Sequence, residues 1–408
     1  PICWRLRGLI NTMEAYALEW LNLLIRWLHI ITGIAWIGAS FYFIWLDNSL
    51  EAPTKDADIR RGVGGELWAV HGGGFYHAEK FRSRPPSIPE RLHWFKWEAY
   101  WTWLSGFALL IIVYYVQAEL YLIDRNVMDL SRPAAIAIGL AFIVGSWVVY
   151  DLLCKSPLAR NGNSLIGVLF ILLCVAAWGL TQIFGGRGAY MHFGAILGTL
   201  MVANVAMVIM PAQRAMVRAA EAGLDPDPKF GIAGKQRSIH NTYFTLPVLF
   251  VMMSNHYAFT YGHRYNWALL VALAMAGALI RVWFVDRHKG TQSPLTLILA
   301  GVLLAVVFWA GMPQTRTDGV AVELKQVHAV LQVRCANCHA QTPTQAGIIA
   351  SPKGILLETE AQIRAQAALI AQQAVTTRAM PPGNLTGMTE DERTLIARWA
   401  AALHSNRK

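Results

Sequence analysis

The sequence predicts an all-α protein, a polytopic membrane helix bundle of about eight spans followed by a smaller C-terminal domain. Of its 408 residues, 55% are hydrophobic and 15% are charged, whereas soluble domains carry about a quarter charged residues. Long apolar runs fill the chain up to Gly311, and the remainder from Gln314 contains none. This apolar content excludes a disordered, collagen-like or coiled-coil protein.

Each apolar run is long enough to cross a hydrocarbon core about 30 Å thick. The predicted spans are Trp20–Trp45, Tyr100–Tyr121, Pro133–Cys154, Ser164–Phe184, Ala189–Met210, Ile239–Tyr261, Tyr265–Val285 and Thr291–Gly311. We therefore divide the chain into an N-terminal extension (1–13), a membrane domain (14–313) and a C-terminal domain (320–408).

The loop charges predict the orientation of these spans. The loops after the odd-numbered spans hold 17 Lys and Arg residues, and those after the even-numbered spans hold four. Because positive loops stay in the cytoplasm, both termini are expected on the opposite side. The net charge of +10 is thus a topology signal, and no nucleic-acid partner is predicted, since such binding needs the charge on one soluble face.

The first cytoplasmic loop, residues 47–98, is unusually long and rich in glycine, histidine and aromatic residues. Loops of this length are usually functional or disordered, and the aromatic content argues against disorder. We expect either a short hairpin or a re-entrant lid.

The most specific motif is Cys335-Ala-Asn-Cys338-His339, the attachment pattern of a c-type haem. The two thiols add to the porphyrin vinyl groups, and His339 becomes an axial ligand of the iron. Met380, followed by two prolines, is predicted as the second axial ligand, with Met388 as the alternative. The C-terminal domain then resembles a class I cytochrome c. A zinc site would need four ligands, and a Cys335–Cys338 disulfide would leave His339 and Met380 unexplained.

Three stretches, Glu19–Asp47, Val70–Tyr76 and His240–Tyr257, together with the haem motif, carry a family resemblance. The chain resembles the bacterial membrane-integral, cytochrome c-linked urate oxidases (urate hydroxylases). The resemblance implies oxidation of urate to 5-hydroxyisourate in purine breakdown, with electrons passing to haem c. It also implies a bacterial inner-membrane protein whose C-terminal domain is periplasmic and delivers electrons to a soluble cytochrome c or a terminal oxidase.

Ionisable residues inside spans are functional hypotheses by default. His29, His192 and His256 are expected on the outer side of the membrane. They predict either a second redox centre, a b-type haem or a metal, or histidines that simply hydrogen-bond a neighbouring helix.

Urate oxidation needs a base, hydrogen-bond donors and an aromatic surface. Histidine is a suitable base near neutral pH, glycine backbone approaches a planar anion closely, and aromatic rings stack on a purine. The predicted catalytic residues are His71, Tyr76, His240 and Asn241, and the predicted substrate-binding residues are Gly72, Gly73, Trp97, Tyr100 and Thr242. The alternative for the aromatic residues is an interfacial belt.

Two other functions remain open from composition and topology. The chain could be a respiratory subunit that passes electrons from quinol to cytochrome c. It could also be a membrane anchor for a cytochrome, although an anchor does not need eight spans and several intramembrane histidines.

Overall fold

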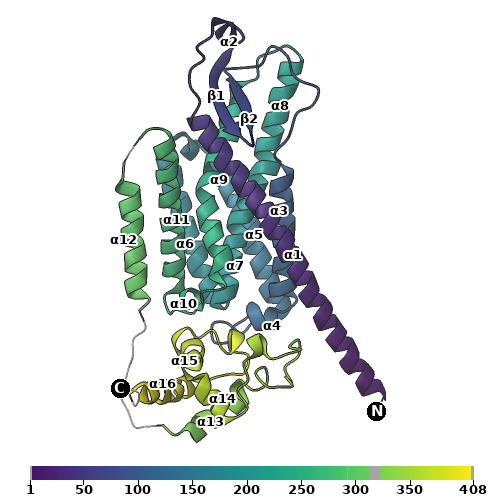
Figure 1. Ribbon diagram of the computed structural model, residues 1–408, viewed down its shortest axis with the longest axis vertical. Coiled ribbons are helices and arrows are strands. Elements are labelled where there is room, and N and C mark those ends of the chain that lie inside the picture. Colours follow the sequence, from purple (N-terminus) through teal and green to yellow (C-terminus); the bar gives the residue numbers. More distant parts are fainter. Residues whose placement is uncertain (1, 292, 313–321, 406–408) are drawn as a thin grey trace.

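The computed structural model describes residues 2–291, 293–312 and 322–405. Long helices lie side by side in a bundle, with a β-hairpin at one end and a small helical domain at the other (Figure 1). We name these the hairpin end and the tail end of the bundle, and the helical domain formed by α13 to α16 the tail domain.

Long and short helices that follow the apolar pattern build the bundle, and one short helix and two strands interrupt them after the first helix. The elements are α1 Ile2–Asn48, α2 Asp56–Arg60, β1 Val63–His71, β2 Gly74–Phe81, α3 Trp97–Leu109, α4 Ala118–Tyr121, α5 Arg132–Lys155, α6 Gly162–Ile183, α7 Gly186–Ala203, α8 Met210–Glu221, α9 Pro228–Ser254, α10 Ala258–Tyr261, α11 Asn266–His288, α12 Leu295–Ala310, α13 Leu324–Arg334, α14 Glu360–Ala365, α15 Ala367–Ile370 and α16 Glu390–Ser405.

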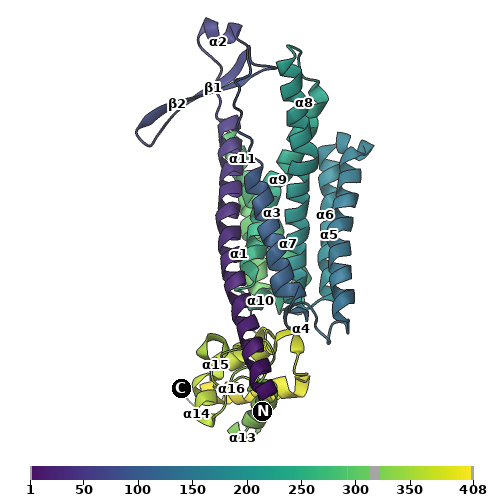
Figure 2. The same ribbon diagram turned by 90° about the vertical axis from the view of Figure 1, so that its right-hand side faces the viewer.

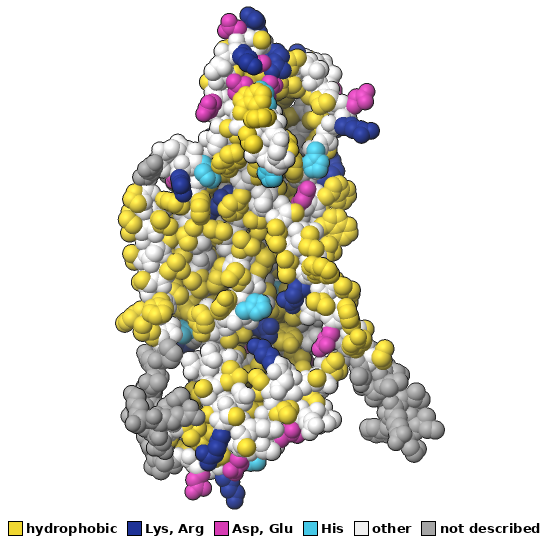
Figure 3. Space-filling model, in the orientation of Figure 1, with side chains coloured by type: hydrophobic (Ala, Val, Ile, Leu, Met, Phe, Trp, Pro, Cys, Tyr) yellow, Lys and Arg dark blue, Asp and Glu magenta, His cyan; other side chains and the backbone are white. Residues whose placement is uncertain are grey.

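Among the described residues, five helical segments are long and apolar enough to cross a membrane, against the eight expected. They are Tyr16–Asn48, Arg132–Lys155, Gly162–Ile183, Gly186–Glu221 and Asn266–His288. The other three predicted spans are helical but differ from a simple apolar helix. Tyr100–Tyr121 is divided between α3 and α4, α9 begins in polar residues at Pro228, and α12 has 16 residues. A hydrophobic belt covers the middle of the visible face, and charged side chains gather at both ends (Figure 3).

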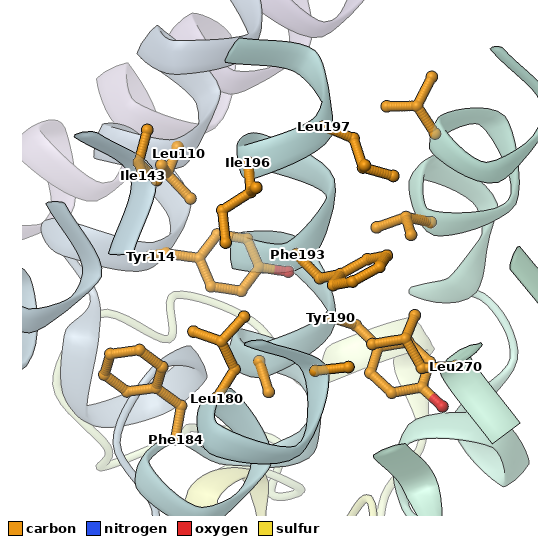
Figure 4. Packing of buried hydrophobic residues seen from close by; sticks show 14 of the residues in the cluster. Leu110, Tyr114, Ile143, Leu180, Phe184, Tyr190, Phe193, Ile196, Leu197 and Leu270 are labelled. Atoms are coloured by element: carbon orange, nitrogen blue, oxygen red, sulfur yellow. The ribbon is translucent and has the colours of Figure 1, made fainter. Parts of the chain in front are cut away.

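Helix α7 is the centre of the bundle because most of its side chains are buried by α5, α6 and α9. Tyr190, Phe193, Ile196 and Leu197 of α7 point into a core that also receives Leu180 from α6 (Figure 4). In lipid, close packing of this kind, rather than hydrophobic exclusion from water, holds helices together.

Two six-residue segments of the bundle wind as π-helix, Leu110–Tyr115 after α3 and Asn204–Ile209 after α7. Such turns usually occur at functional sites because the wider winding displaces side chains from the regular helical positions. Tyr115 and Asn204, one from each segment, are buried and hydrogen-bonded to other helices.

The long loop forms an antiparallel hairpin of β1 and β2, one of the two structures expected for it. The strands extend sideways from the bundle (Figure 2). Gly72 and Gly73 make the two-residue turn with φ of 58° and 80°, the positive values that a type I′ turn requires at both positions. The turn itself therefore explains these two glycines.

The tail domain has its own hydrophobic core, in which Leu331 of α13, Ile363 of α14 and Trp399 of α16 are buried together. Thr359 caps α14 in a capping box with Gln362, which satisfies two otherwise free backbone donors. The expected boundary between the two domains, residues 313–320, lies outside the described residues.

We predict that Gly139→Ala destabilises the bundle. A Cβ at Gly139 of α5 would lie 2.5 Å from His192 Nε2 of α7, and overpacking of this kind costs about 1–3 kcal/mol. Thermal unfolding in detergent measures the loss. Gly145→Ala on the same helix is the control, because nothing lies within 4 Å of its Cβ position and alanine favours the helix by about 0.5–1 kcal/mol. Equal melting temperatures for the two variants would contradict the packing.

Candidate active site

A cluster of polar side chains is buried between α5, α9 and the π segment Asn204–Ile209, toward the hairpin end. We name it the polar cluster and define it by Tyr150, Asp151, Asn204, Arg237, His240 and Asn241. Polar groups at such a position are costly and are a functional hypothesis by default.

The charges of the cluster are paired. Arg237 Nη2 donates to Asp151 Oδ1 at 2.7 Å, and the two side chains are 3% and 16% exposed. Nη1 of the same guanidinium donates to Asn204 Oδ1 at 3.2 Å, and the group also lies 4.9 Å from the centre of the Tyr150 ring. One cation therefore joins α5, α9 and the π segment.

Asn204 determines the direction of the remaining hydrogen bonds. Its Nδ2 donates to the Tyr150 hydroxyl at 2.9 Å and to Asn241 Oδ1 at 2.8 Å. The Tyr150 hydroxyl thus accepts from Asn204 and can donate its own hydrogen to His240 Nδ1, 2.8 Å away. Neutral imidazole carries one proton, so this arrangement leaves it on His240 Nε2, which has no partner among the described residues. The cluster presents an N–H donor there.

The structure brings some of the predicted urate residues together and leaves others apart. His240 and Asn241 are in the polar cluster, and Tyr100 packs against Val205 and Met210 beside the π segment. The Thr242 hydroxyl donates to Ser238 O within α9 at 2.9 Å. Trp97 is exposed at the start of α3.

The other predicted residues lie at the tip of the hairpin, outside the polar cluster. His71, Gly72 and Gly73 are exposed, as is Tyr76. The strands that carry them extend away from the bundle (Figure 2). Nothing in the described part of the chain joins them to His240.

The three outer histidines do not converge on one point; among the described residues, no group of three or more His, Cys, Asp and Glu could hold a metal ion. His192 uses both ring nitrogens, Nδ1 to Gly188 O at 2.9 Å and Nε2 to the Tyr115 hydroxyl at 3.1 Å. His29 bonds Thr102 O through Nδ1 at 2.9 Å, and His256 is exposed. Because both ring nitrogens of His192 are engaged, this residue does not fit as a haem ligand, and we derive no step through a second haem.

The haem motif follows the end of α13 and continues in turn conformation. His339 N donates to Cys335 O at 2.9 Å, and His339 Nδ1 lies 3.0 Å from the carbonyl oxygen of Ile355. A carbonyl only accepts, so Nδ1 carries the proton and Nε2 keeps the lone pair that an iron ligand needs. Cys335 and Cys338 are free thiols, and burial, reinforced by the nearby Cys338, raises the pKa of Cys335 to about 12.

The two methionines of the tail differ in their surroundings. Met388 is buried in the tail core, whereas Met380 is half-buried in the loop before α16. Arg393 Nη1 donates to Met380 O at 3.0 Å, and Met380 N donates to Gln373 O at 3.0 Å. The backbone at Met380 is thus held in place while its thioether stays outside the core. The residues present fit a covalent haem with His339 and Met380 as axial ligands.

Residues 15–311 match the model of the family described as urate oxidase N-terminal. The chain belongs to this urate oxidase family. Comparison with curated proteins and with solved structures gave no match. The match begins within α1 and ends just after α12, so it covers the rest of the bundle with the hairpin and none of the tail domain.

Sequence reasoning missed four residues of the polar cluster: Tyr150, Asp151, Asn204 and Arg237. One signal was present, because Asp151 lies inside the predicted span Pro133–Cys154, and a carboxylate in a span needs a partner. Arg237 was counted as a loop charge, two residues before a predicted span. The structure places it inside α9 instead.

We predict that Asp151→Asn lowers the free energy of unfolding by about 3–5 kcal/mol, because it leaves the guanidinium of Arg237 buried without a counter-charge. Chemical denaturation in detergent measures this effect. Lys155→Gln is the control: it removes the contact of 2.5 Å between exposed Lys155 and Asp151, which is worth less than about 1 kcal/mol at the surface. Similar losses in both variants would show that Asp151 is not needed to compensate Arg237.

Proposed function

We propose that this chain oxidises urate to 5-hydroxyisourate at the polar cluster and passes the electrons to a haem c on the tail domain. The observation that carries the proposal is the polar cluster itself, in a bundle that belongs to the urate oxidase family. The reaction converts urate and water to 5-hydroxyisourate, two protons and two electrons. The site must therefore bind a planar anion, admit water and release electrons.

His240 is the residue that we place against the substrate. Its Nε2–H is a donor suited to an oxygen or a ring nitrogen of anionic urate, while Tyr150 fixes the imidazole through Nδ1. A base at Nε2, the role expected from the sequence, would require the opposite tautomer. Asn204 and Asn241 act as positioning residues, because their amides hold each other and Tyr150 in place.

The tail domain supplies the electron acceptor. When bound, haem c accepts one electron at a time. Cys335 and Cys338 would hold it covalently, and His339 and Met380 would ligate the iron. Covalent haem c is attached outside the cytoplasm, which matches the loop charges, so we propose a protein of the bacterial inner membrane with eight crossings and a periplasmic tail. A soluble cytochrome c or a terminal oxidase would receive the electrons.

A second candidate function has one observation in its favour. An open groove of about 450 Å³ lies between α5, α6 and α7, lined by apolar side chains such as Phe142 and Leu169 and reached by Tyr150. An apolar groove with few polar groups, here the side chains of Ser146 and Tyr150, is the kind of site that holds a quinol. The chain would then transfer electrons from quinol to haem c without urate chemistry.

One anaerobic experiment separates the two functions. We expect urate, added without oxygen to membranes that contain the oxidised protein, to produce the absorption band of reduced haem c, because the electrons of urate then have no other acceptor. Cys335→Ser with Cys338→Ser should abolish the band. Reduction by quinol and not by urate would overturn the proposal in favour of quinol oxidation.

We further predict that His240→Phe lowers kcat/KM for urate-dependent haem reduction by about 10- to 100-fold, the value of one hydrogen bond to a charged group. His240→Gln, which can restore an N–H donor, should recover part of the loss. Chemical reduction by dithionite should be the same in both variants.

His71→Ala tests the role predicted for the hairpin tip. We expect the rate to stay unchanged, because this ring is exposed and outside the polar cluster. A large loss in His71→Ala together with normal activity in His240→Phe would place the chemistry at the hairpin instead.

A further inference from the structure

The tail domain contacts the bundle through the loop that carries Met380. Gly383 of this loop faces the carbonyl oxygens of Ile123 and Glu119 at the tail end, where a Cβ would lie 3.2 Å from Glu119 O. Gly262, at the end of α10, faces the carbonyl oxygen of Thr377 so closely that a Cβ would overlap it. These backbone-to-backbone approaches depend on glycine. We name the segment Thr377–Asn384 the seat loop.

The seat loop is fixed to its own domain. Arg393 of α16 donates to the carbonyl oxygens of Met380 and Ala374, and Arg378 pairs with Glu390 at 2.7 Å. The charge of Arg393 also interacts with Asp124 of the bundle, so opposite charges lie across the contact. Because the seat loop is fixed to its own domain, its contact with the bundle also fixes the rest of the tail domain relative to the bundle.

Aromatic and polar side chains lie in the bundle directly behind the contact. Tyr121 of α4, the helix that touches the seat loop, has the Arg187 guanidinium 4.6 Å from its ring centre. Arg187 Nε and the Tyr114 hydroxyl both donate to Asn255 Oδ1 at 3.0 Å. The adjacent Tyr115 bonds His192 at 3.1 Å. A buried polar group thus begins at the seat and extends into α7.

The opposite side of the tail domain is free of the bundle. Helix α13, which ends in the haem motif, packs against α14 and α16 of its own domain and lies farthest from the bundle (Figure 1). The loop 341–350 that follows the motif is largely exposed. The two surfaces of the tail domain therefore face different surroundings, the bundle at the seat loop and solvent at α13.

We propose that the seat loop is the electron-entry surface of the tail domain, docked on α4 and α10 so that Met380 stays beside the bundle, and that the opposite surface is left for a soluble redox protein. The electron-entry part of this inference rests on the proposed function, since only a tail domain that carries haem c receives an electron. The docking itself does not depend on which substrate supplies it.

Cross-linking across the contact tests the docking. Asp124→Cys with Glu390→Cys places thiols on either side of Arg393, and a short bis-maleimide should link them in the intact, haem-loaded chain. Asp124→Cys with Lys325→Cys, on exposed α13, is the control pair and should stay unlinked. A link in the control pair only, equal links in both, or none in either would overturn the docking.

Gly262→Ala tests the electron step. The added methyl group should displace the seat loop, increase deuterium uptake across 377–384, and slow single-turnover haem reduction by urate at least about tenfold. Reduction by dithionite should be unchanged. Gly301→Ala, with nothing near its Cβ position, should match the unmodified protein throughout. Increased uptake with a normal urate rate would overturn the role of the seat loop in electron entry but leave the proposed function intact. Absence of haem reduction by urate in the unmodified protein would refute the proposed function instead.

Discussion

The ion pair Arg237–Asp151 is the constraint on which the site depends, because the guanidinium is buried among the helices and the carboxylate within hydrogen-bond reach compensates its charge. Because separating the pair would leave a buried charge uncompensated, α5 and α9 are fixed in register at this point. The second branch of the same guanidinium reaches Asn204, which fixes the winding of the π segment. Tyr150 and His240 are then positioned by residues already held in place.

Helix α7 separates this site from the tail end. His192 and Asn204 lie 12 residues apart along it, or about 18 Å at 1.5 Å per residue, and the side chains between them are mainly apolar and buried. Polar contacts of the central helix are therefore concentrated toward its two ends, each beside a π segment, and the bond from Trp103 Nε1 to Thr199 Oγ1 lies between them. A protein that takes a polar substrate at one end and delivers electrons at the other needs this arrangement, because a polar middle would admit water and ions along the whole bundle.

The sequence predicted the elements whose signals are local. Apolar runs gave the course of α5, α6, α7 and α11, and the motif around His339 gave a histidine with a free Nε2. Predicting the polar cluster from sequence was only partly possible, because its members come from three separate segments. Nothing local distinguishes Asn204 from any polar residue near a helix end, and the π winding that turns it inward follows from packing. Gly72 and Gly73 suggested an anion site, yet their positive φ values serve a turn.

The contact between the bundle and the tail domain could not be predicted from the sequence either, because its residues come from distant segments. It indicates that the tail domain is docked on the bundle and not only tethered to it. In the sequence, Gly262 and Gly383 are two glycines among 33, and their role appears only when backbones from distant segments meet. A flexibly tethered carrier would need no such contact, since it could meet the bundle in many orientations. The contact has a glycine on each side, at positions where any side chain would be excluded. This indicates a single orientation of the tail domain, with Met380 toward the bundle. The family match ends before this domain, so the two glycines join a part of the chain that the urate oxidase family model covers to a part that lies outside it.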